Sequence, residues 1–184
     1  MKKSKRWAVF LRGVNVGGKH IVKMAELKTA LEAAGFADVT TFLASGNVWL
    51  TLPETDGARL EKALEIWLAK FAGFDIAAFA RPAETLDALA RFPSAGKESI
   101  EVVSENILFL KTPLTAAQTA ILRAITPVND VLVPRGSEIY WQSGGRQSDS
   151  KFSHALFEKK IGAVCTIRSR NTVEKMAARQ NTEG

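Results

Sequence analysis

One stretch of the chain carries most of the information about its fold: Trp7-Ala8-Val9-Phe10-Leu11-Arg12-Gly13-Val14-Asn15-Val16-Gly17-Gly18-Lys19. Its first five residues are apolar and predict a buried strand over 7–11. Gly13, Gly17 and Gly18 follow within six positions, which indicates a loop whose backbone takes positive φ angles or lets a ligand come close. A helical pattern starts near Met24, so the order is strand, glycine loop, helix.

The remainder of the first half continues this alternation of strands and helices. Apolar spacing predicts helices over 24–34 and 58–71, and β-branched or aromatic runs predict strands over 39–43, 47–52 and 74–80. Ser45-Gly46 suits a tight turn between the second and third strands. The resulting order, β-α-β-β-α-β, is that of the split βαβ or ferredoxin-like unit.

The second half repeats the order with a further helix at each end. The predicted strands are 106–111, 130–133, 138–142 and 164–168, and the predicted helices are 83–91, 115–124, 151–161 and 172–178. Asp149 or Ser150 is expected to cap the third of these helices, and Asn171 with Glu174 has capping-box spacing for the last. We therefore expect an α+β protein of two tandem ferredoxin-like halves with antiparallel sheets, one over 1–81 and one over 82–184.

Positive charge is concentrated at the two ends of the chain. The net charge is +6 over 184 residues, and seven basic side chains precede the first acidic one, Glu26. Basic ends favour phosphate-bearing partners, although a solvated basic tail explains the same residues. The N-terminus lacks a signal-peptide pattern, and no apolar run approaches the roughly 18 residues that span a bilayer. We expect a cytoplasmic protein without membrane contact.

The loop over 12–19 resembles a phosphate-binding P-loop in part. Gly13 and Gly18-Lys19 have the right spacing, but His20 stands where Ser or Thr would hold Mg²⁺, and three residues separate it from the helix. We therefore reject a conventional P-loop nucleotidase. Two interpretations stay open: an anion site made by backbone N–H groups, or a turn without a ligand.

A second basic region lies where a strand passes into the last helix. Arg168 and Arg170 stand beside a predicted helix N-terminus, where positive charge is unfavourable unless an anion or acidic side chains lie nearby. This arrangement favours a functional role for both arginines.

Few residues suggest catalysis or metal binding. Cys165 is the single cysteine, which excludes an internal disulfide and a cysteine-based zinc site, and its apolar neighbours favour a buried position. His20 and His154 are the two histidines and belong to no hydrolase or metalloprotease motif. No catalytic residue, metal site or cofactor is predicted.

The motifs resemble those of a bacterial family known as a domain of unknown function. Its pattern is Leu-Arg-Gly-[Ile/Val]-Asn-Val-Gly-Gly, then Met-x-x-Leu, then Ser-Gly-Asn, which here are residues 11–18, 24–27 and 45–47. The resemblance implies two tandem ferredoxin-like halves and implies no reaction. Relatives often end with Thr-Arg-Asn-Trp-x-Thr, of which this chain keeps Arg168 and Thr172.

The leading hypothesis is a protein that binds a nucleotide or nucleic acid. The ligand-binding residues would be Arg12, Asn15, Gly17, Gly18, Lys19, Arg168 and Arg170. One alternative is an enzyme acting on a small phosphorylated substrate in a cleft between the halves. Another is a regulatory or interaction module without catalysis. The oligomeric state is not predicted.

Overall fold

Residues 4–18, 20–53, 56–91 and 100–180 are described by the structure, a computed structural model. The chain divides into two compact units, Met1–Asp87 with Met176–Gly184, and Ala88–Lys175. Each unit contains its own four-stranded antiparallel sheet. This confirms the predicted α+β class with two similar halves.

The first unit has the order β-α-β-β-α-β. Its elements are β1 (Ser4–Leu11), α1 (Met24–Ala33), β2 (Ala37–Phe42), β3 (Asn47–Pro53), α2 (Gly57–Ala72) and β4 (Ala78–Pro82). The strands lie in the order β2-β3-β1-β4, so β1 pairs antiparallel with both β3 and β4. Both helices are crossover connections between strands that are not neighbours, as the split βαβ unit requires.

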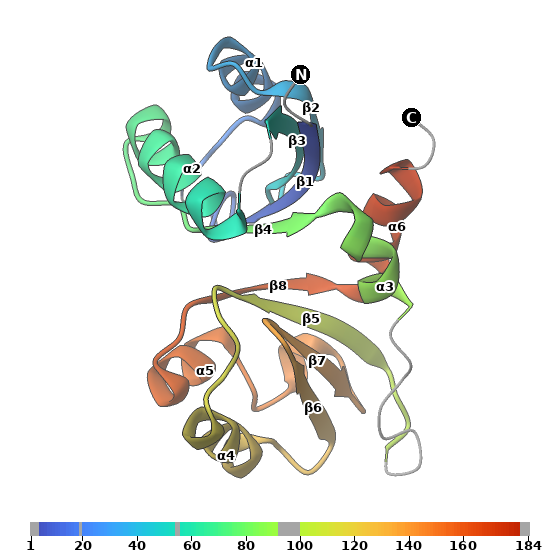
Figure 1. Ribbon diagram of the computed structural model, residues 1–184. Helices are drawn as coiled ribbons and strands as arrows, with labels where there is room; N and C mark the ends of the chain where they lie inside the picture. The colour runs from blue at the N-terminus through green and yellow to red at the C-terminus, as the bar shows by residue number, and fades with distance from the viewer. Residues whose placement is uncertain (1–3, 19, 54–55, 92–99, 181–184) are drawn as a thin grey trace. The chain divides into compact units, whose positions relative to one another are not determined.

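The core of the first unit lies between its sheet and its two long helices. Trp7, Val9 and Leu11 alternate along β1 and belong to this core, because successive strand residues point to opposite faces. α1 and α2 cover that face of the sheet (Figure 1). They contribute residues one turn apart: Leu27 and Leu31 from α1, and Leu60, Leu64 and Leu68 from α2.

Local signals set the ends of α2. The Asp56 carboxylate accepts a hydrogen bond from the Arg59 backbone N–H at 2.8 Å, and Gly73 ends the helix with φ of 77°. The predicted strand over 74–80 begins later, at Ala78, because its pairing with β1 starts only there. A short helical segment follows β4: η1 (Ala83–Thr85) and α3 (Leu86–Ala90).

The second unit repeats the arrangement. Its elements are β5 (Ser104–Leu110), α4 (Ala116–Ile125), β6 (Asp130–Arg135), β7 (Glu138–Ser143), η2 (Gln147–Asp149), α5 (His154–Ile161) and β8 (Cys165–Ser169). The strand order is β6-β7-β5-β8. α4 and α5 cover one face of this sheet (Figure 1) and pack on a core that contains Leu108, Trp141 and Phe157. α6 (Arg170–Gln180) follows β8, and from Met176 it belongs to the first unit.

Two predicted helix starts are wrong. α5 is capped by Ser153, whose hydroxyl accepts from the Leu156 N–H at 3.1 Å. Asp149 lies in η2 instead, and the Ser150 hydroxyl donates to Asp130. α6 begins at Arg170, so Asn171 lies inside the helix instead of capping it. Ser169 takes the capping role and accepts from the Thr172 N–H at 3.3 Å. The cap of α5 thus lies three residues after Ser150, and the cap of α6 lies two residues before Asn171.

The predicted domain boundary at residue 81 falls near the end of β4, within the first unit. The sequence also predicts a polar loop over 93–104, part of which lies outside the described residues. Within the described ranges, no helix is both long and apolar enough to cross a bilayer.

Candidate functional site

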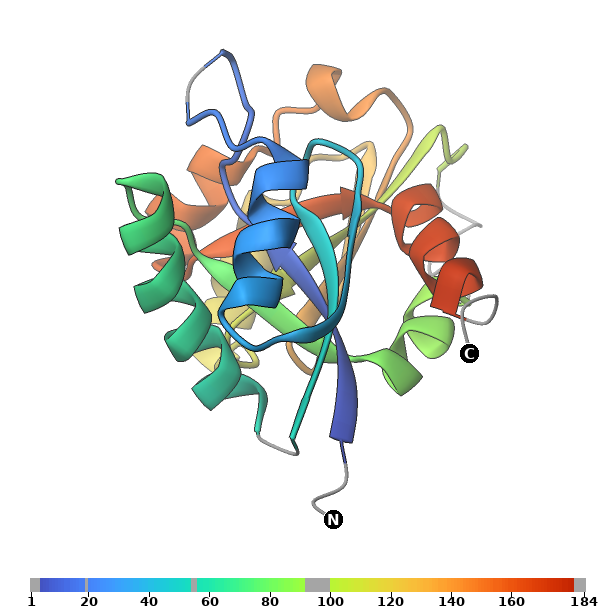
Figure 2. The same cartoon turned by 90° about the horizontal axis from the view of Figure 1, so that it is seen from above.

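The glycine loop between β1 and α1 has an unusual backbone. Figure 2 shows this segment, in blue, standing away from the sheet. Positive φ angles occur at Gly13, Asn15, Gly17, Gly18 and His20. Gly17 and Gly18 are exposed, with φ of 59° and 72°, and a Cβ at either position would meet nothing within 4 Å. Their backbone groups are therefore accessible to a ligand.

Asn15 holds the base of this loop. Its amide nitrogen donates to the carbonyl oxygens of Val22 at 2.9 Å and Ala44 at 2.7 Å, and its Oδ1 accepts from the Val22 N–H at 2.8 Å. Its own φ of 56° is a left-handed value that asparagine tolerates better than most residues. Asn15, one of the predicted ligand-binding residues, thus shapes the loop from within.

The ends of the loop are also fixed. The Arg12 N–H donates to the Ala77 carbonyl at 2.9 Å, and the Asn15 N–H donates to the His20 carbonyl at 3.0 Å. The His20 ring stacks on Phe74 with 4.5 Å between ring centroids. Lys19 lies outside the described residues. α1 begins at Met24, well after Lys19, which agrees with the rejection of a P-loop.

The turn between β2 and β3 packs against this loop. The Leu11 N–H donates to the Gly46 carbonyl at 2.7 Å, and a Cβ on Gly46 would lie 2.5 Å from Val14 Cγ2. Asn47 is fully buried and donates to the Phe42 carbonyl at 2.8 Å. The Ser-Gly-Asn turn therefore supports the glycine loop, a contact that the sequence did not predict.

Arg168 lies on β8 and is buried, with 8% of its surface exposed. Its guanidinium donates to the Thr166 hydroxyl at 2.9 Å and to the Ile167 carbonyl at 2.8 Å. Burial lowers the pKa of Arg168 to about 10, so the side chain is still cationic at neutral pH. Because little of the side chain is exposed, a ligand could contact the Arg168 guanidinium only where the surrounding protein leaves it accessible.

Arg170, the first residue of α6, is surrounded by acceptors. Its guanidinium contacts the Glu105 carboxylate at 3.0 Å, the Glu174 carboxylate at 3.2 Å and the Ala90 carbonyl at 3.0 Å. These two carboxylates are the acidic neighbours that a positive charge at a helix N-terminus needs. Arg170 therefore has a structural role that the sequence did not reveal, because Glu105 comes from β5.

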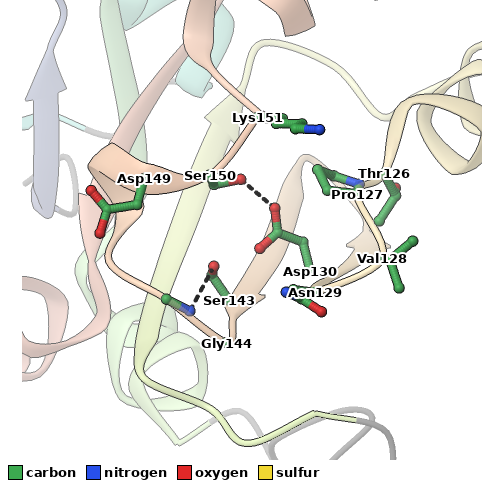
Figure 3. A pocket seen from close by; sticks show the side chains of 11 residues that line it. Thr126, Pro127, Val128, Asn129, Asp130, Ser143, Gly144, Asp149, Ser150 and Lys151 are labelled. Carbon is green, nitrogen blue, oxygen red and sulfur yellow. Dashed lines mark hydrogen bonds between the residues drawn. The ribbon is translucent and has the colours of Figure 1, made fainter.

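A pocket of about 520 Å³ lies in the second unit (Figure 3). The turn before β6 forms one wall, and the segment after β7 forms the other. Lining residues are Thr126, Pro127, Val128, Asn129, Asp130, Ser143, Gly144, Gly145, Asp149, Ser150 and Lys151. This volume lies within the range of small-molecule sites.

Asp130 is the central polar group of the pocket. It is 6% exposed, and one carboxylate oxygen accepts a short hydrogen bond from the Ser150 hydroxyl, which itself accepts from the Phe152 N–H. Within the described residues the other carboxylate oxygen has no hydrogen-bond partner, and Figure 3 shows it among the lining side chains. A buried carboxylate with unused acceptor capacity suits a ligand that donates hydrogen bonds.

The sequence contained a partial signal for this pocket. Gly144-Gly145 precedes Ser150 and Lys151, as in a loop that lets a ligand approach, but Asp130 lies on another strand. Pairing of β6 with β7 places Asp130 opposite Ser143, a relationship that spacing along the chain does not disclose.

Residues 4–140 match the family described as "Protein of unknown function (DUF1697)". The chain belongs to the DUF1697 family. It is also similar to a solved structure described as that of the conserved bacterial protein SP0830 from Streptococcus pneumoniae. The identity is 28%, the TM-score is 0.75, and the alignment covers 96% of this chain and 98% of that one. None of the curated proteins compared with the chain matches it. Membership in the DUF1697 family confirms the resemblance and specifies no reaction.

Proposed function

We propose that this protein binds a phosphate-bearing ligand, a nucleotide or a nucleic acid, on the glycine loop. The observation that carries the proposal is the combination of exposed glycines at 17 and 18 with a base fixed by Asn15. Backbone handedness alternates over residues 13–17, where Gly13, Asn15 and Gly17 have positive φ, and turns of this kind direct N–H groups toward a common point and bind anions there. A loop that is already ordered loses little entropy on binding.

Basic side chains supply the charge in this proposal. Arg12 and Lys19 flank the glycines in sequence and supply the charge at the loop. Arg168 and Arg170, also proposed as ligand-binding residues, belong to the second unit, where Glu105 and Glu174 already balance Arg170. A cytoplasmic location, where nucleotides and nucleic acids are abundant, belongs to the same proposal.

The test compares phosphate compounds with matched charge variants. Inorganic phosphate, pyrophosphate, nucleotides and short oligonucleotides are titrated into the full chain at low salt. Arg12→Ala should weaken binding about 10- to 100-fold, the loss expected for one charge-assisted hydrogen bond. Lys62→Ala removes the same charge from an exposed position on α2 and should leave binding nearly unchanged.

Salt distinguishes the two ligand classes. Nucleic-acid binding should fall steeply between about 50 and 200 mM salt, whereas binding of a single phosphate group should fall less. The proposal fails if none of these compounds binds at low salt, or if Arg12→Ala and Lys62→Ala weaken binding equally.

The pocket around Asp130 favours a second candidate function, action on or binding of a small phosphorylated substrate. Lys151 at its wall offers a cation for a phosphate group, and Asp130 offers a carboxylate for hydroxyl groups. The ligand class that satisfies both is a phosphorylated sugar or a related polyol phosphate. This site lies wholly within the second unit.

Substitutions separate this candidate from the first. Asp130→Asn and Lys151→Ala should abolish binding of sugar phosphates and leave phosphate binding at the glycine loop intact. Lys159→Ala, on the exposed side of α5, is the charge control. Equal affinity of the Asp130→Asn variant and the unmodified chain for every sugar phosphate tested would eliminate this candidate.

A further inference from the structure

Three side chains of different chemical types gather between α5 and β8. They are His154, Glu158 and Cys165, whose ligand-type atoms (a ring nitrogen, a carboxylate oxygen and the sulfur) all lie within 4.8 Å of one another. None of them belongs to the glycine loop or to the pocket around Asp130.

Regular elements hold all three residues. His154 and Glu158 are four positions apart on α5, which places both side chains on one face of the helix. Gly162 ends that helix with φ of 72° and lets the chain turn back into β8, whose first residue is Cys165. The cluster is therefore positioned by a helix, a tight turn and a paired strand.

The histidine ring is oriented by a backbone carbonyl. His154 Nε2 lies 2.7 Å from the Cys165 carbonyl oxygen. A carbonyl oxygen only accepts, so this nitrogen carries the proton, and in the neutral ring Nδ1 is left with its lone pair. Histidines that bind metals typically have this arrangement, with the second ring nitrogen donating to a carbonyl or a carboxylate.

These contacts also brace an edge strand. β8 is the outermost strand of its sheet, and the Cys165 N–H donates to Glu158 Oε1 at 3.4 Å. Bracing explains the contacts with the backbone of residue 165. It does not require a thiol there, because any small side chain would leave the same backbone groups in place.

We infer that His154, Glu158 and Cys165 bind a divalent transition-metal ion of the Zn²⁺ type. Nitrogen, oxygen and sulfur donors together suit Zn²⁺, whereas Mg²⁺ and Ca²⁺ prefer oxygen alone. His154 and Glu158 are partly exposed and Cys165 is buried, so the ion would reach the cluster from the side of the first two. Three protein ligands leave a fourth coordination position for water or a ligand.

Cobalt provides a direct test on the full chain. Co²⁺ replaces Zn²⁺ in such sites, and a bond to a thiolate gives a near-ultraviolet charge-transfer absorption that nitrogen and oxygen ligands do not give. After treatment with a chelator, the chain should take up one equivalent of Co²⁺ with this absorption, and Zn²⁺ should displace it.

Four variants decide the outcome. Cys165→Ala should abolish the charge-transfer absorption, and His154→Ala and Glu158→Gln should each weaken Co²⁺ binding about tenfold or more. His20→Ala, which removes the other histidine of the chain, should leave Co²⁺ binding and the charge-transfer absorption unchanged. Absence of the absorption with excess Co²⁺, or unchanged affinity in the folded His154→Ala and Glu158→Gln variants, would overturn the inference and leave the cluster as a brace.

Discussion

The amide nitrogen of Asn15 lies 2.7 Å from the carbonyl oxygen of Ala44 and joins two segments that are 29 positions apart. This bond connects the glycine loop after β1 to the turn between β2 and β3. The shape of the loop does not depend on its glycines alone, because a polar side chain at its base satisfies three backbone groups.

Asn15→Ala should destabilise the first unit and weaken ligand binding together. Three hydrogen bonds are lost, and partly buried backbone groups lose their partners, which costs about 1–3 kcal/mol of the free energy of unfolding. Asn15→Asp keeps the acceptor for the Val22 N–H but places a carboxylate oxygen against the carbonyl oxygens of Val22 and Ala44, so its loss should be at least as large. Denaturant unfolding measures both. Wild-type stability of Asn15→Ala would show that the bonds do not hold the loop.

Gly46→Ala should be more disruptive than other glycine substitutions. Its Cβ would lie 2.5 Å from Val14 Cγ2 and 2.8 Å from Leu11 Cβ, at a φ of 78°. Gly35→Ala is the matched control, with φ of 94° and nothing within 4 Å. Gly35→Ala should lower the free energy of unfolding by about 1–2 kcal/mol, because an alanine is strained in a left-handed backbone conformation. Gly46→Ala should lose more than this by denaturant unfolding, and equal losses would show that the loop moves aside easily.

The order of strands and helices could be predicted from sequence because it depends on local apolar periodicity. Leu60, Leu64 and Leu68 mark one face of α2, and Trp7, Val9 and Leu11 mark one face of β1, without any knowledge of distant contacts. Helix starts were less certain, because several nearby Ser, Asn and Asp side chains can serve as caps. Tertiary packing selects Ser153 and Ser169 among them.

Site residues were harder to predict because their partners come from other strands. Arg170 is balanced by Glu105, which lies 65 positions away, and Asp130 meets Ser150 only through the folding of the second sheet. The histidine, glutamate and cysteine of α5 and β8 are close in sequence. Their close spacing was a usable signal for the proposed metal site. The sequence analysis set this signal aside because the chain has a single cysteine, but a single cysteine excludes only sites built from several cysteines.

Loss of the Arg170–Glu105 pair should destabilise the second unit. Both carboxylate oxygens of Glu105 accept from Arg170 Nη1, at 3.1 and 3.0 Å, and the two side chains are roughly a quarter to a third exposed. Partial exposure reduces the effect, so Arg170→Ala should cost about 1–3 kcal/mol. A double-mutant cycle with Glu105→Gln isolates the pair. A coupling energy near zero would show that Arg170 acts through Glu174 or the Ala90 carbonyl instead.

Tyr140 should titrate well above the ordinary range for tyrosine. Burial raises its pKa to about 12, and the negative charge of Glu138 acts in the same direction. Because Tyr140 is the single tyrosine of the chain, phenolate absorbance during a pH titration reports this one group.

The same shift predicts how stability changes in alkali. Between about pH 10, where the unfolded phenol ionises, and about pH 12, the folded state binds more protons than the unfolded state, so stability falls as pH rises. Below about pH 10 the phenol is protonated in both the folded and the unfolded state, so the stability linked to its titration is present in full. Tyr140→Phe should remove this part of the pH dependence while keeping the buried ring. Ionisation near pH 10 in a chain whose circular dichroism is still native would show that the phenol is not buried as the structure places it.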